Sequence, residues 1–250
     1  MLAGKNLSVT PYIGNTLHGV SGSSTPKDLE TALQLVYLYF ADPRFDEAEY
    51  ETGIQQIKAI LPNIAKNPDF LFQNAVSRIL YNNPRLVELN EENLAKADLA
   101  TIERVYKELF KDAAGAEMYI TGNVDPAAIK PLVEKYIGSI AKGKKASEVN
   151  KENIIKVVKG EVDETVKLPM ETPKSTVIQI YTAYMPVDTK TEVALSVANY
   201  VLDMIYTKTI REEEGGTYGV GTAMVGQREP EERVVIQVSF DTNPEQAPKL

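Results

Sequence analysis

The stretch "REEEGGTYGV", residues 211–220, marks the point where a helix ends and a strand begins. Three glutamates precede two glycines, and glycine readily takes the left-handed conformation that terminates helices. We therefore expect Gly215 and Gly216 to end the helix through a left-handed residue. The same stretch places Arg211 in the last helical turn and Tyr218, seven residues later, at the head of the strand.

Arg211 and Tyr218 allow two interpretations. Arginine offers a rigid fork of donors, and tyrosine offers one phenolic donor. If the turn brings both side chains to one side, they could hold successive carbonyl groups of an extended peptide, or stabilise an oxyanion. Alternatively, Arg211 complements the helix dipole and pairs with a glutamate, while Tyr218 packs. The spacing alone favours this second interpretation.

The glycines of "GGTYGVG" do not form a phosphate loop. A phosphate loop lies between a strand and the N-terminus of the next helix, where backbone amides point outward. Here the order is helix, loop, strand, so the loop lies at the negative end of a helix beside three glutamates. The position of the loop therefore argues against nucleotide binding.

Composition excludes several other classes of function. The chain has 250 residues, of which 43% are hydrophobic and 25% charged, as in an ordinary globular protein. A net charge of −8 argues against nucleic acid, and no apolar run reaches the ~20 residues that span a bilayer. The chain has no cysteine and a single histidine, His18, in a turn-like segment. We expect His18 to lie at the surface and the chain to bind no metal.

The periodicity of apolar residues predicts an α+β fold, with a mixed or antiparallel sheet and helices packed on one face. Strands are predicted at 7–13, 116–122, 161–169 and 175–185, followed by two more within "GGTYGVGTAMV" and "RVVIQVSFDT". Helices are predicted to begin at Thr25-Pro26 and at an Asp46–Glu49 capping box, and to span 69–81, 98–110, 126–136 and about 190–213.

The chain is predicted to contain two domains. Residues 139–152 are charged and include the short basic cluster "AKGKKASEVNK", which is typical of a linker. We expect a mainly helical part at 1–140, a linker at 141–158 and a mainly sheet part at 159–250. A strand end, a polar turn and an Asn/Thr-Pro helix start recur in "GVSGSSTPKDLETAL" and "SFDTNPEQAPKL". This recurrence suggests two incomplete homologous units.

Three segments resemble the pitrilysin/insulin-degrading-enzyme family of zinc metallopeptidases, the inverzincins. They are "IREEEGGTYGVGTAM" with the following "VVIQVSFDTNPEQ", "YITGNVDPAAIKPLVEKYIGSI" and "GVSGSSTPKDLETALQLVYLYFADPRFDEAEYE", and together they cover nearly the whole chain. The resemblance implies α+β units paired into two halves that close around a chamber. It places this chain in the C-terminal half, which does not bind zinc.

The resemblance also implies a division of roles. In the family, an H-x-x-E-H motif in the N-terminal half binds zinc and activates water. The C-terminal half contributes an arginine and a tyrosine that bind substrate, and Arg211 and Tyr218 match these residues in identity and spacing. This chain has no H-x-x-E-H motif, so we expect no catalytic residue, no bound zinc and no hydrolysis by the chain alone.

The expected partners are a peptide or protein substrate and a zinc-bearing N-terminal half. A homodimer through exposed sheet edges is a further expectation. Family habit suggests a bacterial periplasmic or cell-envelope location. Two alternatives stay open: a non-catalytic structural or chaperone-like homologue, and a module that binds peptides by strand addition.

Overall fold

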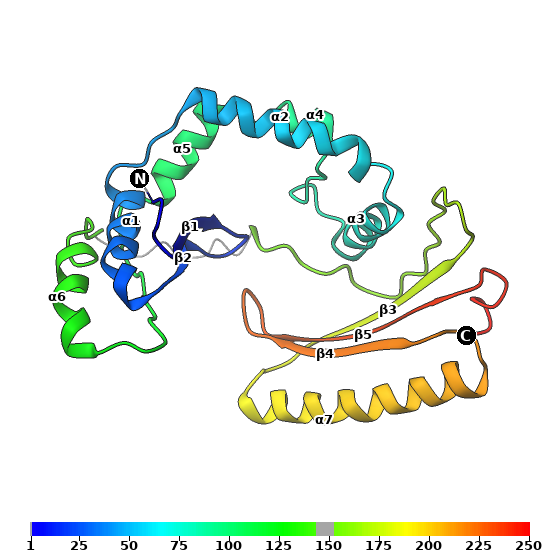
Figure 1. Cartoon of the computed structure of the whole chain (residues 1–250). Helices are drawn as coiled ribbons and strands as arrows, with labels where there is room; N and C mark the ends of the chain where they lie inside the picture. The colour runs from blue at the N-terminus through cyan, green and yellow to red at the C-terminus, as the bar shows by residue number, and fades with distance from the viewer. Residues whose placement is uncertain (1, 144–152) are drawn as a thin grey trace. The chain divides into compact units, whose positions relative to one another are not determined.

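The computed structural model describes residues 2–143 and 153–250. They form two compact units, Met1–Val162 and Asp163–Leu250, each considered by itself below (Figure 1). Both units combine helices with an antiparallel sheet, so the predicted α+β class is confirmed. Much of the predicted linker, at 144–152, lies outside the described residues, and the predicted domain boundaries stay predictions. Across the described residues, no helix combines the length and hydropathy needed to cross a membrane.

A β-hairpin forms the sheet of the first unit. Strand β1 (Leu7–Ile13) pairs antiparallel with β2 (His18–Ser24). Strand β1 was predicted, but the glycine- and serine-rich stretch after it forms β2 and not a turn. Glycine is required in β2 because a methyl group at Gly22 would overlap the Ser8 carbonyl oxygen. His18 is exposed at the start of β2.

Helices make up most of the rest of this unit. They are η1 (Pro26–Asp28), α1 (Leu29–Ala41), α2 (Glu47–Ile64), α3 (Pro68–Tyr81), α4 (Glu91–Leu94), α5 (Leu99–Leu109) and α6 (Pro126–Tyr136). Helix α1 packs against the hairpin and against α6 (Figure 1). The predicted cap of α2 is confirmed, because the Asp46 carboxylate accepts a hydrogen bond from the Glu49 amide at 3.1 Å.

Aromatic rings form the centre of the first unit. Phe110, only 1% exposed, stacks on Tyr106 with ring centroids 4.3 Å apart and meets Phe40 edge-on at 5.3 Å. The Tyr106 hydroxyl donates to the carbonyl of Tyr39. Burial raises the pKa of Tyr106 to about 12, so this hydroxyl stays protonated and remains a donor. The cluster thus fixes the end of α5 against α1.

Asp28 joins the hairpin to the first helix. Its buried carboxylate accepts hydrogen bonds from the Asn6 amide at 2.9 Å and the Thr25 hydroxyl at 3.0 Å, and Lys5 lies 3.6 Å away. The Asn6 amide above all, with Thr25 and Lys5, holds the pKa of Asp28 below its ordinary value. Folding therefore favours the ionised form.

This geometry predicts an acid-sensitive contribution to stability. Because the folded-state pKa is lowered, Asp28 stabilises the unit fully above the ordinary carboxyl pKa, and the contribution is lost as pH falls through the lowered value. Asp28→Asn should lower the melting temperature at pH 7, and the difference from the wild type should shrink as pH falls through the lowered pKa of Asp28. Thermal denaturation by circular dichroism from neutral to strongly acidic pH measures this. A difference in melting temperature between the wild type and Asp28→Asn that stays constant at all pH values would contradict this prediction.

Two predicted strands are wrong. Residues 116–122 and 161–169 carry strand-like patterns, but both segments are irregular and largely exposed, with Tyr119 82% exposed. A strand is stable only when its backbone groups pair with a neighbour. Among the described residues, neither segment is a strand of either sheet.

The helix start predicted at Asn243-Pro244 is also wrong. This segment forms turns, in which the Asn243 carbonyl accepts a hydrogen bond from the Gln246 amide.

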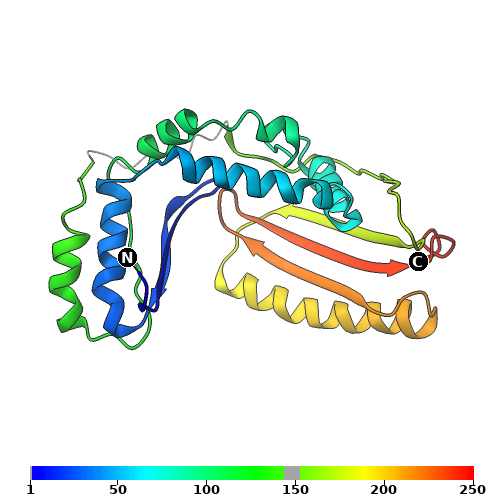
Figure 2. The same ribbon diagram turned by 45° about the horizontal axis from the view of Figure 1, so that its top comes forward.

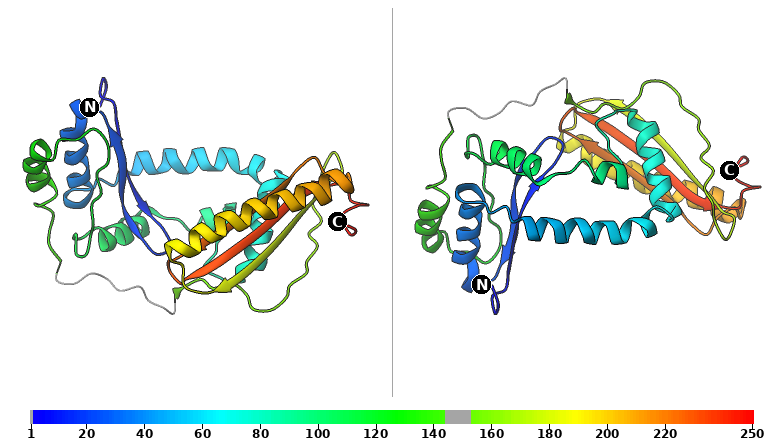
Figure 3. Two further views of the ribbon diagram at one scale, coloured as in Figure 1. Left: turned by 90° about the horizontal axis from the view of Figure 1, so that it is seen from below. Right: turned by 90° about the horizontal axis from the view of Figure 1, so that it is seen from above.

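The second unit is a sheet with one long helix. Strand β5 (Arg233–Thr242) lies between β3 (Ser175–Tyr184) and β4 (Val220–Gln227), antiparallel to both (Figure 2). The register pairs Val220 with Phe240 and Ser175 with Thr242. Helix α7 (Thr189–Tyr206) lies along one face of this sheet (Figure 3). Strand β5 carries the buried residues Val234, Val238 and Phe240, which share one face.

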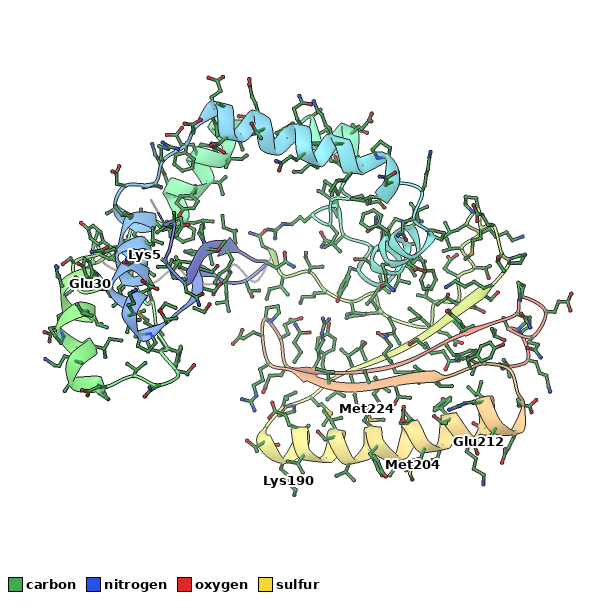
Figure 4. The ribbon with its side chains drawn as sticks, viewed as in Figure 1. Lys5, Glu30, Lys190, Met204, Glu212 and Met224 are labelled. Carbon is green, nitrogen blue, oxygen red and sulfur yellow. The ribbon has the colours of Figure 1, made fainter. Side chains whose placement is uncertain are left out.

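The apolar stripe of α7 faces away from the sheet. Helical spacing predicts one shared face for five apolar residues of α7, and all but the half-buried Leu202 are exposed: Val193, Val197, Val201 and Ile205. Lys190 and Met204 extend from the same outer side, whereas Met224 of β4 lies between sheet and helix (Figure 4). The N-cap of α7 is Asp188, whose carboxylate accepts a hydrogen bond from the Thr191 amide at 2.7 Å.

Candidate functional site

Arg211 lies on a widened continuation of α7. The helix continues as a π-helical segment, η3 (Thr207–Glu213), after which the Glu214 amide donates to the Thr209 carbonyl. The Thr209 hydroxyl donates to the Ile205 carbonyl at 2.9 Å. The buried side chain of Ile210 anchors η3, and Arg211 next to it is exposed. Segments of π-helix occur frequently at functional sites.

The acidic residues after Arg211 have other cationic partners. Lys208 lies 3.8 Å from Glu213, and Lys249 contacts Glu214. In residues 2–143 and 153–250, no ion pair or hydrogen bond involves the Arg211 guanidinium. The predicted pairing of Arg211 with a glutamate is therefore wrong in this structure. The guanidinium is an exposed cation at the negative end of a helix, where the dipole favours it.

The two glycines after the glutamates have different roles. Gly215 has φ of +59°, so its predicted left-handed conformation is confirmed. Gly216 does not have a positive φ, so Gly215 is the left-handed residue of the two. Instead Gly216 is buried: its amide donates to the Ile210 carbonyl, its carbonyl accepts from the Thr242 hydroxyl, and a methyl group there would overlap Leu250.

Tyr218 is the middle residue of the segment Gly216–Val220, which leads from the end of the helix into β4. We call this segment the Tyr218 arch. Inside it, the Thr217 hydroxyl donates to the Gly219 carbonyl at 2.9 Å and lies 3.3 Å from the Gly219 amide. Tyr218 is 98% exposed, so the alternative that it packs into the protein is wrong. Its hydroxyl has no hydrogen-bond partner within the described part of the chain.

The structure thus presents both predicted residues to solvent from one helix–strand connection. No contact joins Arg211 to Tyr218 among the described residues, so both keep their donors for a third group. A cationic fork and a neutral phenol suit carbonyl oxygens or a developing oxyanion. Three adjacent glutamates make the same place unfavourable for phosphate.

The residues of this chain do not fit a catalytic zinc ion. The sequence has one histidine and no cysteine, and the described residues contain no group of three metal-ligating side chains. His18 lies in the first unit, where its ring meets that of Phe110 edge-on at 5.3 Å. No reaction step through zinc can therefore be assigned to these residues.

Thr242 is a site residue that the sequence reasoning missed. It is the last residue of β5, and its side chain is buried. Val234, Val238 and Phe240 lie on the buried face of β5, and Thr242 is the next residue on that face. A polar residue in this apolar series was the sequence signal that could have identified it. A buried hydroxyl needs a partner, and Gly216 provides it.

The loop predicts a local stability effect. Gly215→Ala should lower the unfolding free energy by about 1–2 kcal/mol, because an L-residue with a side chain is strained at φ of +59°. Gly219→Ala is the matched control, since it lies in the same connection without a positive φ and with open space around it. Urea denaturation of both variants checks this. Equal losses in the two would show that the left-handed conformation is not the cause.

Fold and loop together define an α+β domain of the metallopeptidase-half type. The periplasmic protease PqqL from Escherichia coli superposes with a TM-score of 0.81 at 20% identity, and the match covers 99% of this chain and 27% of that chain. The ferredoxin protease FusC, solved as a mutant in complex with Arabidopsis ferredoxin, gives 0.79 at 16% identity over 99% and 27%. Pitrilysin gives 0.54 at 14% identity over 95% and 25%.

The family model described as the inactive domain of M16 peptidases matches residues 96–250. The chain therefore belongs to the M16 peptidase family, and the resemblance to pitrilysin is confirmed. A zinc protease PQQL-like protein from Arabidopsis thaliana is 33% identical over 120 residues, which are 46% of this chain and 12% of that protein. The chain spans about a quarter of the length of these solved structures.

Proposed function

We propose that this chain is the substrate-binding part of a zinc-dependent endopeptidase that hydrolyses peptides or proteins in a closed chamber. Arg211 and Tyr218 bind the backbone of an extended peptide near the scissile bond. The observation that carries the proposal is the solvent-directed pair itself. Tyr218 is 98% exposed and Arg211 has no partner in the described protein, although both lie on an anchored connection.

Each side chain has a defined task in this proposal. The Arg211 guanidinium is always protonated and donates to a substrate carbonyl oxygen through its planar fork. The Tyr218 phenol donates to a second carbonyl, or to the same oxygen when negative charge develops on it during hydrolysis. The neighbouring glutamates disfavour anionic ligands, so an uncharged peptide backbone is the better match.

Zinc and the water that attacks the substrate belong to another part of the parent protein. This chain lacks the ligands, so a zinc-bearing N-terminal half is the required partner and the chain alone is inactive. The description of the matched family as an inactive domain, and the zinc protease among the relatives, support this division. A homodimer through sheet edges has no support from these relatives. A bacterial periplasmic or cell-envelope location remains a prediction, and PqqL offers a periplasmic precedent.

A non-catalytic structural or chaperone-like protein is the second candidate. It is favoured by the match to an inactive domain, because such a protein would keep the scaffold without zinc ligands. Stand-alone peptide binding is also compatible with β4, an edge strand that follows Tyr218 directly. Sequencing the parent gene separates enzyme from scaffold, since an H-x-x-E-H motif is required only for the enzyme.

The experiment that tests the proposal is steady-state kinetics on a full-length parent protein that contains this chain and an H-x-x-E-H half. Tyr218→Phe and Arg211→Ala should each reduce kcat/KM for an unstructured peptide while the protein stays folded. Unchanged turnover in both variants would overturn the assignment of the two residues. Absence of zinc-dependent turnover in the unmodified protein would overturn the enzymatic function.

A further inference from the structure

The Tyr218 arch is attached at both ends to the same strand. At one end, Val220 pairs with Phe240 in the β4–β5 register. At the other end, the carbonyl of Gly216 accepts a hydrogen bond from the hydroxyl of Thr242, which is 26 residues further along the chain. Phe240 and Thr242 are two residues apart on β5, so their backbones are separated by roughly 7 Å. The arch therefore spans a short, fixed distance.

The segment is longer than the separation of its attachment points on β5. The four residue steps from Gly216 to Val220 could reach roughly 13–14 Å if fully extended. The two attachment points on β5 are only roughly 7 Å apart, so a segment of this length has slack and its middle is free to project from the sheet. Tyr218 is the middle residue, and its nearly complete exposure agrees with this geometry.

The strand that carries Thr242 is a firm support. β5 is the central strand, paired over its whole length with β3 and from Arg233 to Phe240 with β4. Thr242 is paired with Ser175 and its side chain is buried. Asp28 and Thr242 are the two buried polar or charged residues within the described ranges 2–143 and 153–250. A buried hydroxyl on a central strand has few alternative positions.

The arch needs such a support because its own backbone is permissive. Gly216 and Gly219 lie within it and Gly215 precedes it, and glycine loses more conformational freedom on folding than any other residue. Without the bond to Thr242, the hydrogen bonds left to fix the arch in the described residues are those between Thr217 and Gly219 and the one from the Gly216 amide to Ile210, beside the packing of Leu250 on Gly216. The tyrosine would then sample many orientations.

We infer that Thr242 is a positioning residue for Tyr218: its hydroxyl, bonded to the Gly216 carbonyl, holds the arch in the shape that presents the phenol to substrate. This inference rests on the proposed function, because it concerns how the same peptide site is organised. Thr242 does not touch the peptide. It acts by raising the fraction of molecules in which Tyr218 is correctly placed.

The first test uses variants of the 250-residue chain and an unstructured peptide of about ten residues with an N-terminal fluorescent label. Thr242→Val keeps the shape and removes the hydroxyl, and should weaken binding by about five- to tenfold, because apparent affinity falls with the competent fraction. Thr242→Ser keeps the hydroxyl and should bind within about twofold of wild type. If Thr242→Val does not fold, Thr242→Ala against Thr242→Ser isolates the hydroxyl in the same way.

A double-variant comparison shows whether the effect passes through Tyr218. In a Tyr218→Ala background, Thr242→Val should change binding by less than about twofold, because there is no phenol left to position. An equal loss in both backgrounds, or failure of Thr242→Ser to restore binding, would overturn the inference.

Backbone dynamics separate this inference from the proposed function. Amide relaxation in the peptide-free chain should show increased motion of Thr217, Tyr218 and Gly219 in Thr242→Val, with β5 unchanged. Unchanged relaxation would overturn the positioning role even if peptides bind. If the wild-type chain and the parent protein bind no peptide but the arch loosens as expected, the proposed function fails and the anchoring role of Thr242 stands.

Discussion

Replacing Phe110 with alanine is expected to lower the unfolding free energy of the Met1–Val162 unit by about 3–5 kcal/mol. Phe110 is only 1% exposed and its ring contacts Tyr106, Phe40 and His18. Removing it deletes apolar burial and these aromatic contacts, and leaves a cavity in which the remaining rings cannot fully collapse. Domains of this size are stable by about 5–15 kcal/mol, so the loss is a large fraction of the total stability.

The measurement is urea denaturation followed by far-ultraviolet circular dichroism. Tyr119→Ala is the matched control, because this aromatic residue is 82% exposed in an irregular segment and its removal creates no cavity. It should change the unfolding free energy by less than about 0.5 kcal/mol. A loss below about 1 kcal/mol for Phe110→Ala would show that the aromatic cluster is not the stabilising core of the unit.

Tyr218→Phe and Arg211→Ala in a full-length parent enzyme are each expected to reduce kcat/KM about tenfold or more. Tenfold corresponds to about 1.4 kcal/mol of lost transition-state stabilisation, which is a lower bound, since removing one donor directed at developing charge typically costs about 2.7–4 kcal/mol. Tyr218→Phe removes only the hydroxyl. Since Tyr218 is exposed and has no partner within the described residues, this change should leave stability unaltered.

Two controls distinguish these effects from general surface changes. Tyr200→Phe removes a hydroxyl from a different exposed tyrosine, which lies on α7. Lys208→Ala removes a cation from the η3 segment that also carries Arg211. Both should keep kcat/KM within about twofold, as expected for surface positions outside a site. Losses as large as those of Tyr218→Phe and Arg211→Ala would indicate a diffuse electrostatic effect and contradict a specific donor pair.

Elements with strong local signals could be predicted from the sequence. The Asp46–Glu49 cap located the start of α2, and the alternation in "RVVIQVSFDT" located β5. Residues 116–122 and 161–169 have equally strand-like patterns, but pairing decides whether a strand forms and no neighbour receives them in the described sheets. Strand β2 was missed because its glycines resemble a turn, whereas close approach to β1 requires Gly22.

Helix α7 shows why a hydrophobic stripe does not reveal its environment. The spacing of Val193, Val197 and Val201 indicates one helix face, but this face points away from the sheet. Leu195 lies on the opposite face, near Gly226 of β4, so both sides of the helix carry apolar residues. Periodicity shows which residues share a helix face, but only tertiary packing determines which face is buried against the sheet.

The candidate site was partly predictable. Arg211 and Tyr218 were identified by spacing and by family resemblance, while spacing alone favoured a purely structural role for them. The exposure of both side chains decides against packing. The bond from Thr242 to Gly216 could not be predicted, because it depends on the meeting of segments distant in sequence.

The most direct test of the central claim is a peptide titration followed by nuclear magnetic resonance of the chain with labelled tyrosine rings and arginine side chains. We predict that the Tyr218 ring and Arg211 guanidinium signals shift together, with one dissociation constant, while other exposed tyrosines, such as Tyr119 and Tyr200, do not. Saturable shifts elsewhere, with Tyr218 and Arg211 unchanged, would contradict the claim that these two residues bind the peptide.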